Sequence, residues 1–592
     1  MSNASRRRRL RFLACCVLAA ATARAQAAPD GCPGSPWPAV DALGRDLPLA
    51  AECGAPRPGR HAGIFYFLWH EHVGPGRPGG EGPYDVARII AADPGAAKKP
   101  DSPLWGPIGT YHYWAEPLFG YYLPTDPWVL RRHAHLLSDA GIDVLIMDAT
   151  NALTYRRVYE KLCEVFMDVR RAGDATPRIA FMVNTNAGRT AQKLYADLYA
   201  PGLFRDLWFV WDGKPLLLCD PAQASPEVRE FFTLRRAHWP FEMVNTPHAW
   251  HWEATYPQPY GYTDDPAKPE QVNVSVAQNL RAADGKVTNM SEGNARGRSF
   301  HDGRQDRAPG AADRGCNFQE QWKRAYELDP PFVMVTGWNE WIAGRWGAAG
   351  GPLVFVDQFD REFSRDIEPM RGGHGDNYYY QLVAGVRRYK GAPTLPAASA
   401  PATIAIDGAF DAWRAVAPEF LDHAGETMPR NSAGTGGTAY ADASGRNDIA
   451  AAKVARDARN LYFYVRVRAP LAPRGSDPWM WLLIDADRSA ATGWEGYEWI
   501  ANRAADPDGG VWLEKHDGAW NWKKTARIAF RAGGNELHLA IPRAALGLPE
   551  GTAVAIDFKW VDGALRPGEI MDFHTCGDVA PGGRFRYRYA AE

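Results

Sequence analysis

The chain has 592 residues, a formal net charge of −2 and 23 tryptophans. It is too long for a single hydrophobic core, so two or more domains are expected. The balanced charge excludes the strongly basic surface that nucleic acids or anionic membranes would need, and this much tryptophan is typical of proteins that handle carbohydrates.

The first 27 residues have the pattern of an export signal. Arginines dominate residues 6–11, residues 12–21 are apolar, and small residues then provide a cleavage site. The apolar run is too short to remain as a membrane anchor, and no other segment is long and apolar enough to span a bilayer. We therefore expect a secreted or periplasmic protein. A lipoprotein acylated at Cys15 is the less favoured alternative, because it would leave almost no apolar region.

Residues 28–60 are rich in proline, glycine and alanine, and are expected to form an irregular lead-in. Cys32 and Cys53 bracket this segment and could pair in an oxidising compartment. The remaining cysteines have no metal-ligand spacing and are expected to be buried as small apolar residues. They are Cys163, Cys219, Cys316 and Cys576.

Residues 61–391 alternate between predicted strands and helices, and polar residues repeatedly follow a strand. The predicted strands are 63–69, 143–147, 178–183, 207–210, 216–219, 241–244 and 332–335, and the predicted helices are 126–140, 155–169, 316–328 and 378–389. This alternation predicts a (β/α)₈ TIM barrel. A doubly wound sheet is the alternative, but no glycine-rich phosphate turn follows any strand.

A linker rich in proline and alanine, residues 392–401, separates this part from residues 402–592. There, short β-rich runs recur between turns and helical periodicity is almost absent. The runs are 403–406, 451–455, 461–467, 479–484, 528–530, 536–541 and 553–560. This pattern predicts an all-β sandwich domain.

The most informative stretch is residues 331–344. An apolar run, 332–335, is followed by Trp338-Asn339-Glu340-Trp341 at the presumed carboxyl end of a barrel strand, where active sites of this fold lie. A carboxylate between two indoles is partly desolvated and suits a general acid, base or nucleophile. We expect the indoles to present flat faces to a sugar and Asn339 to bond a hydroxyl. The alternative is that both tryptophans are core residues and Glu340 caps a helix.

This stretch resembles the strand end of glycoside hydrolase family 99 and related (β/α)₈ glycan-processing domains. The resemblance implies a glycan substrate and a second glutamate three residues after the first, where this chain has Ala343, so only Glu340 carries over. The segment Arg365-Asp366-Ile367-Glu368-Pro369 is similar to the continuation of the family motif after an insertion. Glu368 is therefore a substitute candidate for the second catalytic carboxylate.

Glycoside hydrolysis generally needs two carboxyl groups across the scissile bond. Asp148, Glu253, Glu292 and Asp357 also compete for the role of second carboxylate, and Asp148 is the strongest of them because its very apolar strand leaves the acid facing the barrel mouth. Further residues near predicted strand ends are expected to bind substrate: His70, Glu71, Asn184, His248, Trp250, His251, Glu253, Glu292 and Asp357. The histidines could instead hold a metal, but no metal-binding spacing lies on a predicted helix, so bonding to sugar hydroxyls is favoured.

In the C-terminal part, residues 406–408, 461–464 and 484–497 resemble carbohydrate-binding module family 9 and its sandwich relatives. The resemblance implies glycan binding through exposed aromatic residues, with Trp494 and Tyr497 as first choices. Trp520 and Trp522 are second choices. Asp485 and Asp487 could hold a hard cation such as Ca²⁺, and a turn rich in aspartate is the alternative.

Together these features predict an exported glycoside hydrolase with an appended carbohydrate-binding module. It would act on a polysaccharide or oligosaccharide without a catalytic cofactor. One alternative is a transglycosylase or glycan-synthesis enzyme on the same barrel. Another is a catalytically silent glycan-binding surface protein, which the alanine at position 343 keeps open.

Overall fold

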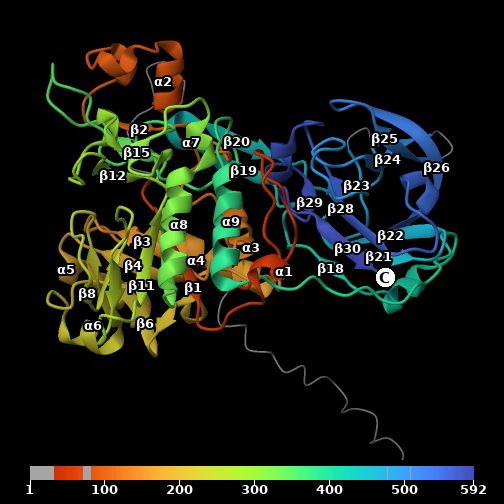
Figure 1. Ribbon diagram of the computed structural model, residues 1–592, viewed down its shortest axis with the longest axis horizontal. Helices are drawn as coiled ribbons and strands as arrows, with labels where there is room; N and C mark the ends of the chain where they lie inside the picture. Colours follow the sequence, from red (N-terminus) through yellow and green to blue (C-terminus); the bar gives the residue numbers. More distant parts are fainter. Residues whose placement is uncertain (1–31, 71–81, 476–477, 507–508) are drawn as a thin grey trace, which may run out of the picture.

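The computed structural model describes residues 32–70, 82–475, 478–506 and 509–592. The predicted export signal at residues 1–27 and the predicted binding residue Glu71 lie outside the described residues. Figure 1 shows a barrel and a β-rich unit side by side, with helix α9 (Asn377–Lys390) standing between them. Within the described ranges, no helix has the length and apolarity needed to cross a membrane.

The first unit is built on eight strands whose ladders are parallel. In chain order they are β1 (His61–Tyr66), β3 (Val144–Ala149), β4 (Arg178–Val183), β6 (Lys214–Leu218), β7 (Thr233–His238), β9 (Ala249–His251), β11 (Gln271–Ser275) and β16 (Phe332–Thr336). Parallel pairing runs without interruption from β11 through β16, β1, β3, β4, β6 and β7 to β9. The predicted barrel is confirmed.

The remaining seam, between β9 and β11, is joined by a side chain. The Gln271 amide accepts from the His251 N–H at 2.9 Å and donates to the His251 carbonyl at 2.7 Å, which imitates a ladder step. Strand β10 (Tyr260–Tyr262) pairs antiparallel with β11 and approaches β9 closely. A Cβ on Gly261 would lie 1.9 Å from the Ala249 carbonyl oxygen, so only glycine permits this approach.

Helices cover the outside of the barrel. They are α3 (Pro127–Asp139), α4 (Arg156–Arg171), α5 (Ala187–Leu194), which continues into the π-helical turn η4 (Tyr195–Tyr199), α6 (Pro226–Phe231), α8 (Cys316–Leu328) and α9. The four predicted helices are present as α3, α4, α8 and α9, and α5 and α6 are additional. Asp126 caps α3 by accepting from the Trp128 N–H, as the Asp-Pro start predicts.

Two predicted strands differ from the structure. In place of the one at 207–210 there is a short strand, β5 (Val210–Trp211), which Asp212 and Gly213, both at positive φ, join to β6. The predicted strand at 241–244 is wrong, because β7 occupies 233–238 instead. Strand β7 looks polar in sequence, but Arg235 is neutralised inside the barrel by ion pairs with Glu270 and Asp212.

Long connections form a cap over the carboxyl ends of the strands, and Figure 1 shows them gathered at one end of the barrel. Two short strands of this cap, β2 (Tyr111–Tyr113) and β17 (Ile342–Gly344), pair with each other. Its other elements are α2 (Val86–Ala92), η2 (Ala96–Lys98), η3 (Pro103–Trp105), β12 (Gln278–Arg281), β13 (Ala295–Arg296), η6 (Met290–Glu292), β14 (Phe300–His301), β15 (Arg304–Gln305) and α7 (Ala311–Arg314). Buried aromatic side chains, among them Trp105 and Trp114, order this cap.

The second unit is an antiparallel sheet that folds over on itself. Its strands, in spatial order, are β18 (Phe420–Leu421), β21 (Ile449–Arg456), β22 (Asn460–Val467), β27 (Glu536–Pro542), β26 (Trp522–Gly533), β25 (Val511–His516), β24 (Trp499–Ala505), β23 (Trp481–Asp485), β28 (Val554–Asp562) and β29 (Asp578–Ala580), with β30 (Tyr587–Ala591) also on β28. Phe463 and Phe558 face each other across the two layers at 5.8 Å. The sandwich prediction is confirmed. The predicted strand at 403–406 is wrong, although Ile404 there is buried against the sheet.

The lead-in is mostly irregular, as predicted, with one short helix, α1 (Ala50–Cys53). The pairing of Cys32 with Cys53 is wrong: both are free thiols. The Cys32 sulfur is buried 3.9 Å from the Ser138 hydroxyl, and the Cys53 thiol donates to the Leu49 carbonyl at 3.1 Å. Each thiol therefore has its own hydrogen-bond partner, and the two do not form a disulfide.

The two units share a polar interface. Asp376, at the start of α9, is fully buried and binds Arg584 at 2.8 Å and His574 at 3.1 Å. A hairpin of β19 (Arg430–Ala433) and β20 (Ala439–Asp442) also packs on the barrel, where Arg430 pairs with the helix cap Asp126 at 2.8 Å. Ion pairs with so little access to water are weakly screened by salt.

We predict that a protease cleaving in the exposed part of the 392–401 linker gives fragments of roughly 40 and 20 kDa that remain associated. Denaturing electrophoresis should show two bands, while size-exclusion chromatography shows one peak even at high salt. Separate elution of the two fragments under native conditions would contradict this expectation and show that the interface contributes little.

Candidate active site

Glu340 lies just beyond the carboxyl end of β16, at the capped end of the barrel. Its backbone is fixed there because its N–H donates to the Asp366 carboxylate and the preceding Trp338 N–H donates to the Phe65 carbonyl at 2.8 Å. The side chain is 6% exposed. One carboxylate oxygen, Oε2, accepts from the Gln358 amide at 2.7 Å and from Arg365 Nη2 at 2.8 Å.

Arg365 is the centre of the site. Its guanidinium is 1% exposed and contacts three carboxylates: Glu340, Glu253 and Asp357. Glu253 follows β9 and is fully buried, with its second oxygen accepting from the Asn279 N–H at 2.9 Å. Asp357 lies 3.4 Å from Arg365 Nη2, and its side chain is 40% exposed. The site thus combines enclosed carboxylates with one that solvent reaches.

Burial and neighbouring charges shift the pKa values of these groups. Burial raises the pKa of Glu340 well above its usual range; Arg365 opposes the shift and the negative charge of Asp357 adds to it. Burial also raises the pKa of Glu253. Burial disfavours the charge on Arg365, but Glu340 and Glu253 outweigh that effect and keep the pKa of its guanidinium raised. Glu340 can therefore hold a proton near neutral pH.

Asp148, at the end of β3, belongs to the same rim. It is 3% exposed, and its Oδ1 accepts from the Thr150 N–H at 2.9 Å and the Thr150 hydroxyl at 2.7 Å. Burial raises the pKa of this carboxyl, and the charge of Asp357 raises it further. Asp148 and Asp357 are thus within electrostatic range of each other across the mouth.

Glu368 occupies a different environment. It is fully buried, and its Oε1 pairs with His133 at 3.0 Å. Its Oε2 accepts from the Tyr122 hydroxyl at 2.7 Å and the Trp341 indole at 2.6 Å. His133, Tyr122 and Trp341 thus occupy both oxygens of Glu368. Glu368 is not among the three carboxylates that contact Arg365, which are Glu340, Glu253 and Asp357.

The residues next to Glu340 are enclosed rather than open to a sugar, which corrects the expectation for four of them. Trp341 is stacked on Trp114, with centroids 4.9 Å apart, and Trp338 packs against His133 and Tyr379. The Asn339 side chain accepts from the Phe67 N–H at 2.9 Å, and His70 meets the Asn339 carbonyl at 2.7 Å. All four side chains are buried, and their contacts hold the loops at the carboxyl end of the barrel in place.

Other predicted binding residues are also placed away from Glu340. His248 precedes β9 and so lies at its amino end, on the opposite side of the barrel. Trp250 is fully buried and donates to Glu270 at 2.7 Å. His251 is fully buried and stacked on His238. The expectation that these three meet substrate is corrected, because a strand end read from sequence does not tell which side chains point outward.

Two of the residues predicted to bind substrate, Asn184 and Glu292, are exposed, but their hydrogen bonds go to residues away from Arg365. Asn184 follows β4 at the correct rim and accepts from the Trp239 indole at 3.0 Å. Glu292 belongs to the short helix η6 in the cap, and its oxygens bond Thr288, Asn289 and Asn294. Neither contacts the Arg365 group.

Sequence reasoning missed a file of aromatic rings that leads outward from the mouth. Trp69 and Tyr111 lie 5.8 Å apart, and Tyr111 and Trp346 lie 6.0 Å apart. Trp346 is 46% exposed, the largest opening among the three. Trp69 and Trp346 come from separate loops and Tyr111 from the short strand β2, so no periodic pattern in the sequence connects them.

In the sandwich, the first-choice platforms Trp494 and Tyr497 are 9% and 1% exposed, which corrects their expected exposure. The Trp494 ring is covered by Trp520, at 4.5 Å. Carboxylate oxygens of Asp485, Asp487 and Glu498 lie within 4.8 Å of one another. Asp485 is also paired with Arg586 at 2.5 Å, so a cation is not its only source of positive charge.

Comparison with known proteins gives a limited result. No protein-family model matches the chain, and no curated protein matches it. Two solved structures of a GH99 endo-α-mannosidase from Bacteroides thetaiotaomicron are similar to it. They share 14% and 13% identity with this chain, have TM-scores of 0.32 and 0.31, and align with 56% of this chain and 97% of their own.

Proposed function

We propose that this protein is an exported glycoside hydrolase that cleaves a polysaccharide or oligosaccharide, with Glu340 as proton donor and Asp357 as the second carboxylate. One observation carries the proposal: Nη2 of Arg365 contacts both acids, and their environments differ. Glu340 is buried with a raised pKa, while the side chain of Asp357 is 40% exposed. Two carboxyl groups in such different environments can remain one protonated and one ionised, as the acid and base roles require.

The geometry also supports a stereochemical outcome. The two oxygens lie 2.8 and 3.4 Å from one nitrogen, so they are at most about 6.2 Å apart. Retaining glycosidases hold their carboxyls about 5–5.5 Å apart, whereas inverting ones need about 6.5–9.5 Å to admit a water. We therefore propose retention of the anomeric configuration, with Asp357 as nucleophile.

Asp148 and Glu368 are the other candidates for the second carboxylate. Both are more enclosed than Asp357: Asp148 is 3% exposed and Glu368 is fully buried with both oxygens bonded. We assign Glu368 to orienting the Trp341 indole, and Asp148 to electrostatic support of the mouth. An Asp148→Asn variant serves as the direct rival to Asp357→Asn in the test below.

The aromatic file of Trp69, Tyr111 and Trp346 supports a glycan as substrate, because a sugar stacks its C–H face on such rings. Export rests on the signal-like residues 1–27. Glycan binding by the sandwich belongs to the same proposal and now rests on the half-buried Trp520 and Trp522. A structural Ca²⁺ at Asp485 and Asp487 is proposed from the carboxylate cluster they form with Glu498.

The proposal is tested by measuring reducing ends released from a panel of polysaccharides. We expect turnover on at least one glycan, and proton NMR of the first product should show the substrate's anomeric configuration. Asp357→Asn should lose activity far more than Asp148→Asn. Inversion, or the reverse ranking, would reject Asp357 as nucleophile. Glycan binding without any released reducing end would support the silent binding protein instead.

A further inference from the structure

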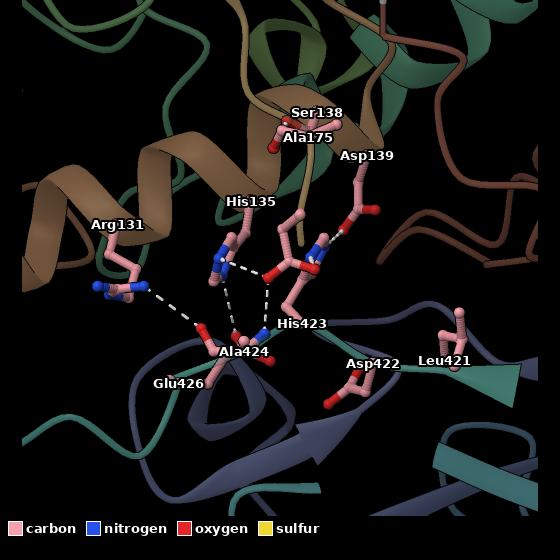
Figure 2. Close-up of polar contacts among 12 residues, drawn as sticks. Arg131, His135, Ser138, Asp139, Ala175, Leu421, Asp422, His423, Ala424 and Glu426 are labelled. Carbon is pink, nitrogen blue, oxygen red and sulfur yellow. Dashed lines mark hydrogen bonds and ion pairs between the residues drawn. The ribbon is translucent and has the colours of Figure 1, made fainter. Parts of the chain in front are cut away.

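The junction between the two units contains a group of acids that the proposed reaction does not use. Figure 2 shows His423, Ala424 and Glu426, which follow β18, facing His135 and Asp139 on α3. His423 contacts Asp139 at 3.2 Å, and the Ala424 N–H donates to Asp174 at 2.7 Å. Glu426 pairs with Arg132 of the barrel. Residues 422–426 therefore dock the sandwich onto α3.

Three carboxylates converge beside this segment. Asp422 and Glu426 belong to it, and Asp578 opens β29. Each contributes an oxygen that lies within 4.8 Å of the other two. The residues are 9%, 6% and 1% exposed. One oxygen of each, Oδ2 of Asp422, Oε2 of Glu426 and Oδ1 of Asp578, has no hydrogen-bond partner among the described residues.

The positive charges around the group neutralise it only in part. Arg132 binds the other oxygen of Glu426. Lys559 is fully buried nearby, but its ammonium donates to the Pro581 carbonyl. His423 lies between Asp139 and Asp174, and Asp448 adds another acid next to Gly425. Buried carboxylates are stable when paired or bound to a cation, and here one oxygen of each acid has no partner among the described residues.

A separate observation also points to a missing ligand. His135 lies outside the carboxylate group and is 3% exposed, and among the described residues neither ring nitrogen has a partner at hydrogen-bond distance: Nε2 lies 4.0 Å from Asp174 Oδ2. Its Nδ1 points at Glu426 Oε1 from 3.7 Å. A cavity of about 20 Å³ beside it is lined by His135, His423, Asp139 and Glu426. That is room for about one water molecule, which could bond the ring.

We propose that Asp422, Glu426 and Asp578 bind one calcium ion at the junction of the barrel and the sandwich, with a water in the adjoining cavity linking it to His135. The ion would neutralise the three unpartnered oxygens and fix residues 422–426 against α3. This site is independent of the proposed active site and of the Asp485 cluster, where Arg586 already supplies positive charge.

The dimensions favour calcium over other divalent ions. Three oxygens no more than 4.8 Å apart can all lie within about 2.8 Å of one central point, and Ca²⁺ takes oxygen ligands at about 2.3–2.6 Å. Mg²⁺ requires about 2.0–2.1 Å and near-ideal octahedral geometry, so the group would have to contract more. Zn²⁺ prefers nitrogen and sulfur ligands, and no ring nitrogen belongs to the group.

The test compares thermal unfolding of the full chain in EDTA and in excess CaCl₂, with MgCl₂ as the ion control. The variants are Asp422→Asn and Asp578→Asn, with Asp487→Asn as matched control for the sandwich site. Ca²⁺ should raise the Tm of Asp487→Asn, in which only the junction site is intact, by about 5 °C, and that of the parent by at least as much. Asp422→Asn and Asp578→Asn should each lose about that much of the parent's response, and equilibrium dialysis should show one fewer bound Ca²⁺ in each.

Measurements in EDTA keep the proposal testable if one variant is unstable. Without the ion, each asparagine removes one unneutralised buried carboxylate, so the Tm should equal or exceed that of the parent. Two results would overturn the proposal: a parent whose Tm and bound calcium do not respond to CaCl₂, or Asp422→Asn and Asp578→Asn proteins that bind as much Ca²⁺ as the parent. The first result would indicate that the three carboxyls are neutralised by protons.

Discussion

Glu340→Gln is expected to lower kcat/KM by about 10²–10⁴-fold on the substrate identified by the screen, because glutamine cannot give up a proton to the leaving group. The change preserves size and one carbonyl acceptor for Gln358 and Arg365, so substrate affinity and folding should be retained. The measurement is steady-state kinetics together with glycan binding by calorimetry.

A matched control and a pH series sharpen this experiment. Glu292→Gln changes an exposed cap glutamate with only local contacts and should leave kcat/KM unchanged. In the parent, activity should fall as pH rises through the raised pKa of Glu340, because the ionised form cannot act as acid. A Glu340→Gln protein that turns over within a few-fold of the parent would reduce Glu340 to a structural role.

The raised pKa of Glu340 also predicts how the stability of the fold changes with pH. Above the ordinary pKa of glutamate, the folded chain keeps the Glu340 proton that the unfolded chain has lost, so raising the pH through the folded pKa removes stability. Glu340→Gln lacks this loss. The difference in Tm between variant and parent should therefore shift in favour of the variant as pH rises.

Arg365→Met is expected to lower the free energy of unfolding by about 3–5 kcal/mol, because it leaves buried carboxylates without their counter-charge. Arg365 is 1% exposed at its side chain and binds Glu253, which is fully buried, as well as Glu340. Urea unfolding followed by tryptophan fluorescence measures the change. Activity should disappear as well, since Arg365 positions both proposed catalytic acids.

Two further arginine variants calibrate that result. Arg371→Met removes a surface ion pair with Glu116, where both partners are partly exposed, and should cost less than about 1 kcal/mol. Arg365→Lys keeps the charge but cannot contact three carboxylates with a planar fork, so it should fall between. Equal stability of Arg365→Met and Arg371→Met would show that the buried acids are neutralised by protons rather than by Arg365.

The architecture could be predicted because its signals are local. The apolar run at 178–183 and the amphipathic face of 155–169 determine a strand and a helix with little help from neighbours, and the structure has both within two residues. Strand β7 escaped prediction because its burial depends on Arg235 meeting Glu270, a partner 35 residues away.

The candidate site likewise has features that a local pattern predicts and features that depend on distant residues. Glu340 was found because it follows an apolar strand directly, but its role depends on Gln358 and Arg365, which come from a later loop. Glu253 reaches Arg365 across 112 residues of chain. Trp338 and Trp341 illustrate the limit most clearly: a tryptophan beside a catalytic candidate can serve as platform or core, and only the packed structure places them in the core.

The sequence by itself determined the two-part architecture and the position of Glu340 at a strand end, because periodicity and strand order are written in consecutive residues. Tertiary structure decided which acids share Arg365, which aromatic rings reach the surface and which carboxylates meet at the junction of the two units. Burial and charge neutralisation are properties of distant segments brought together, and no local pattern encodes them.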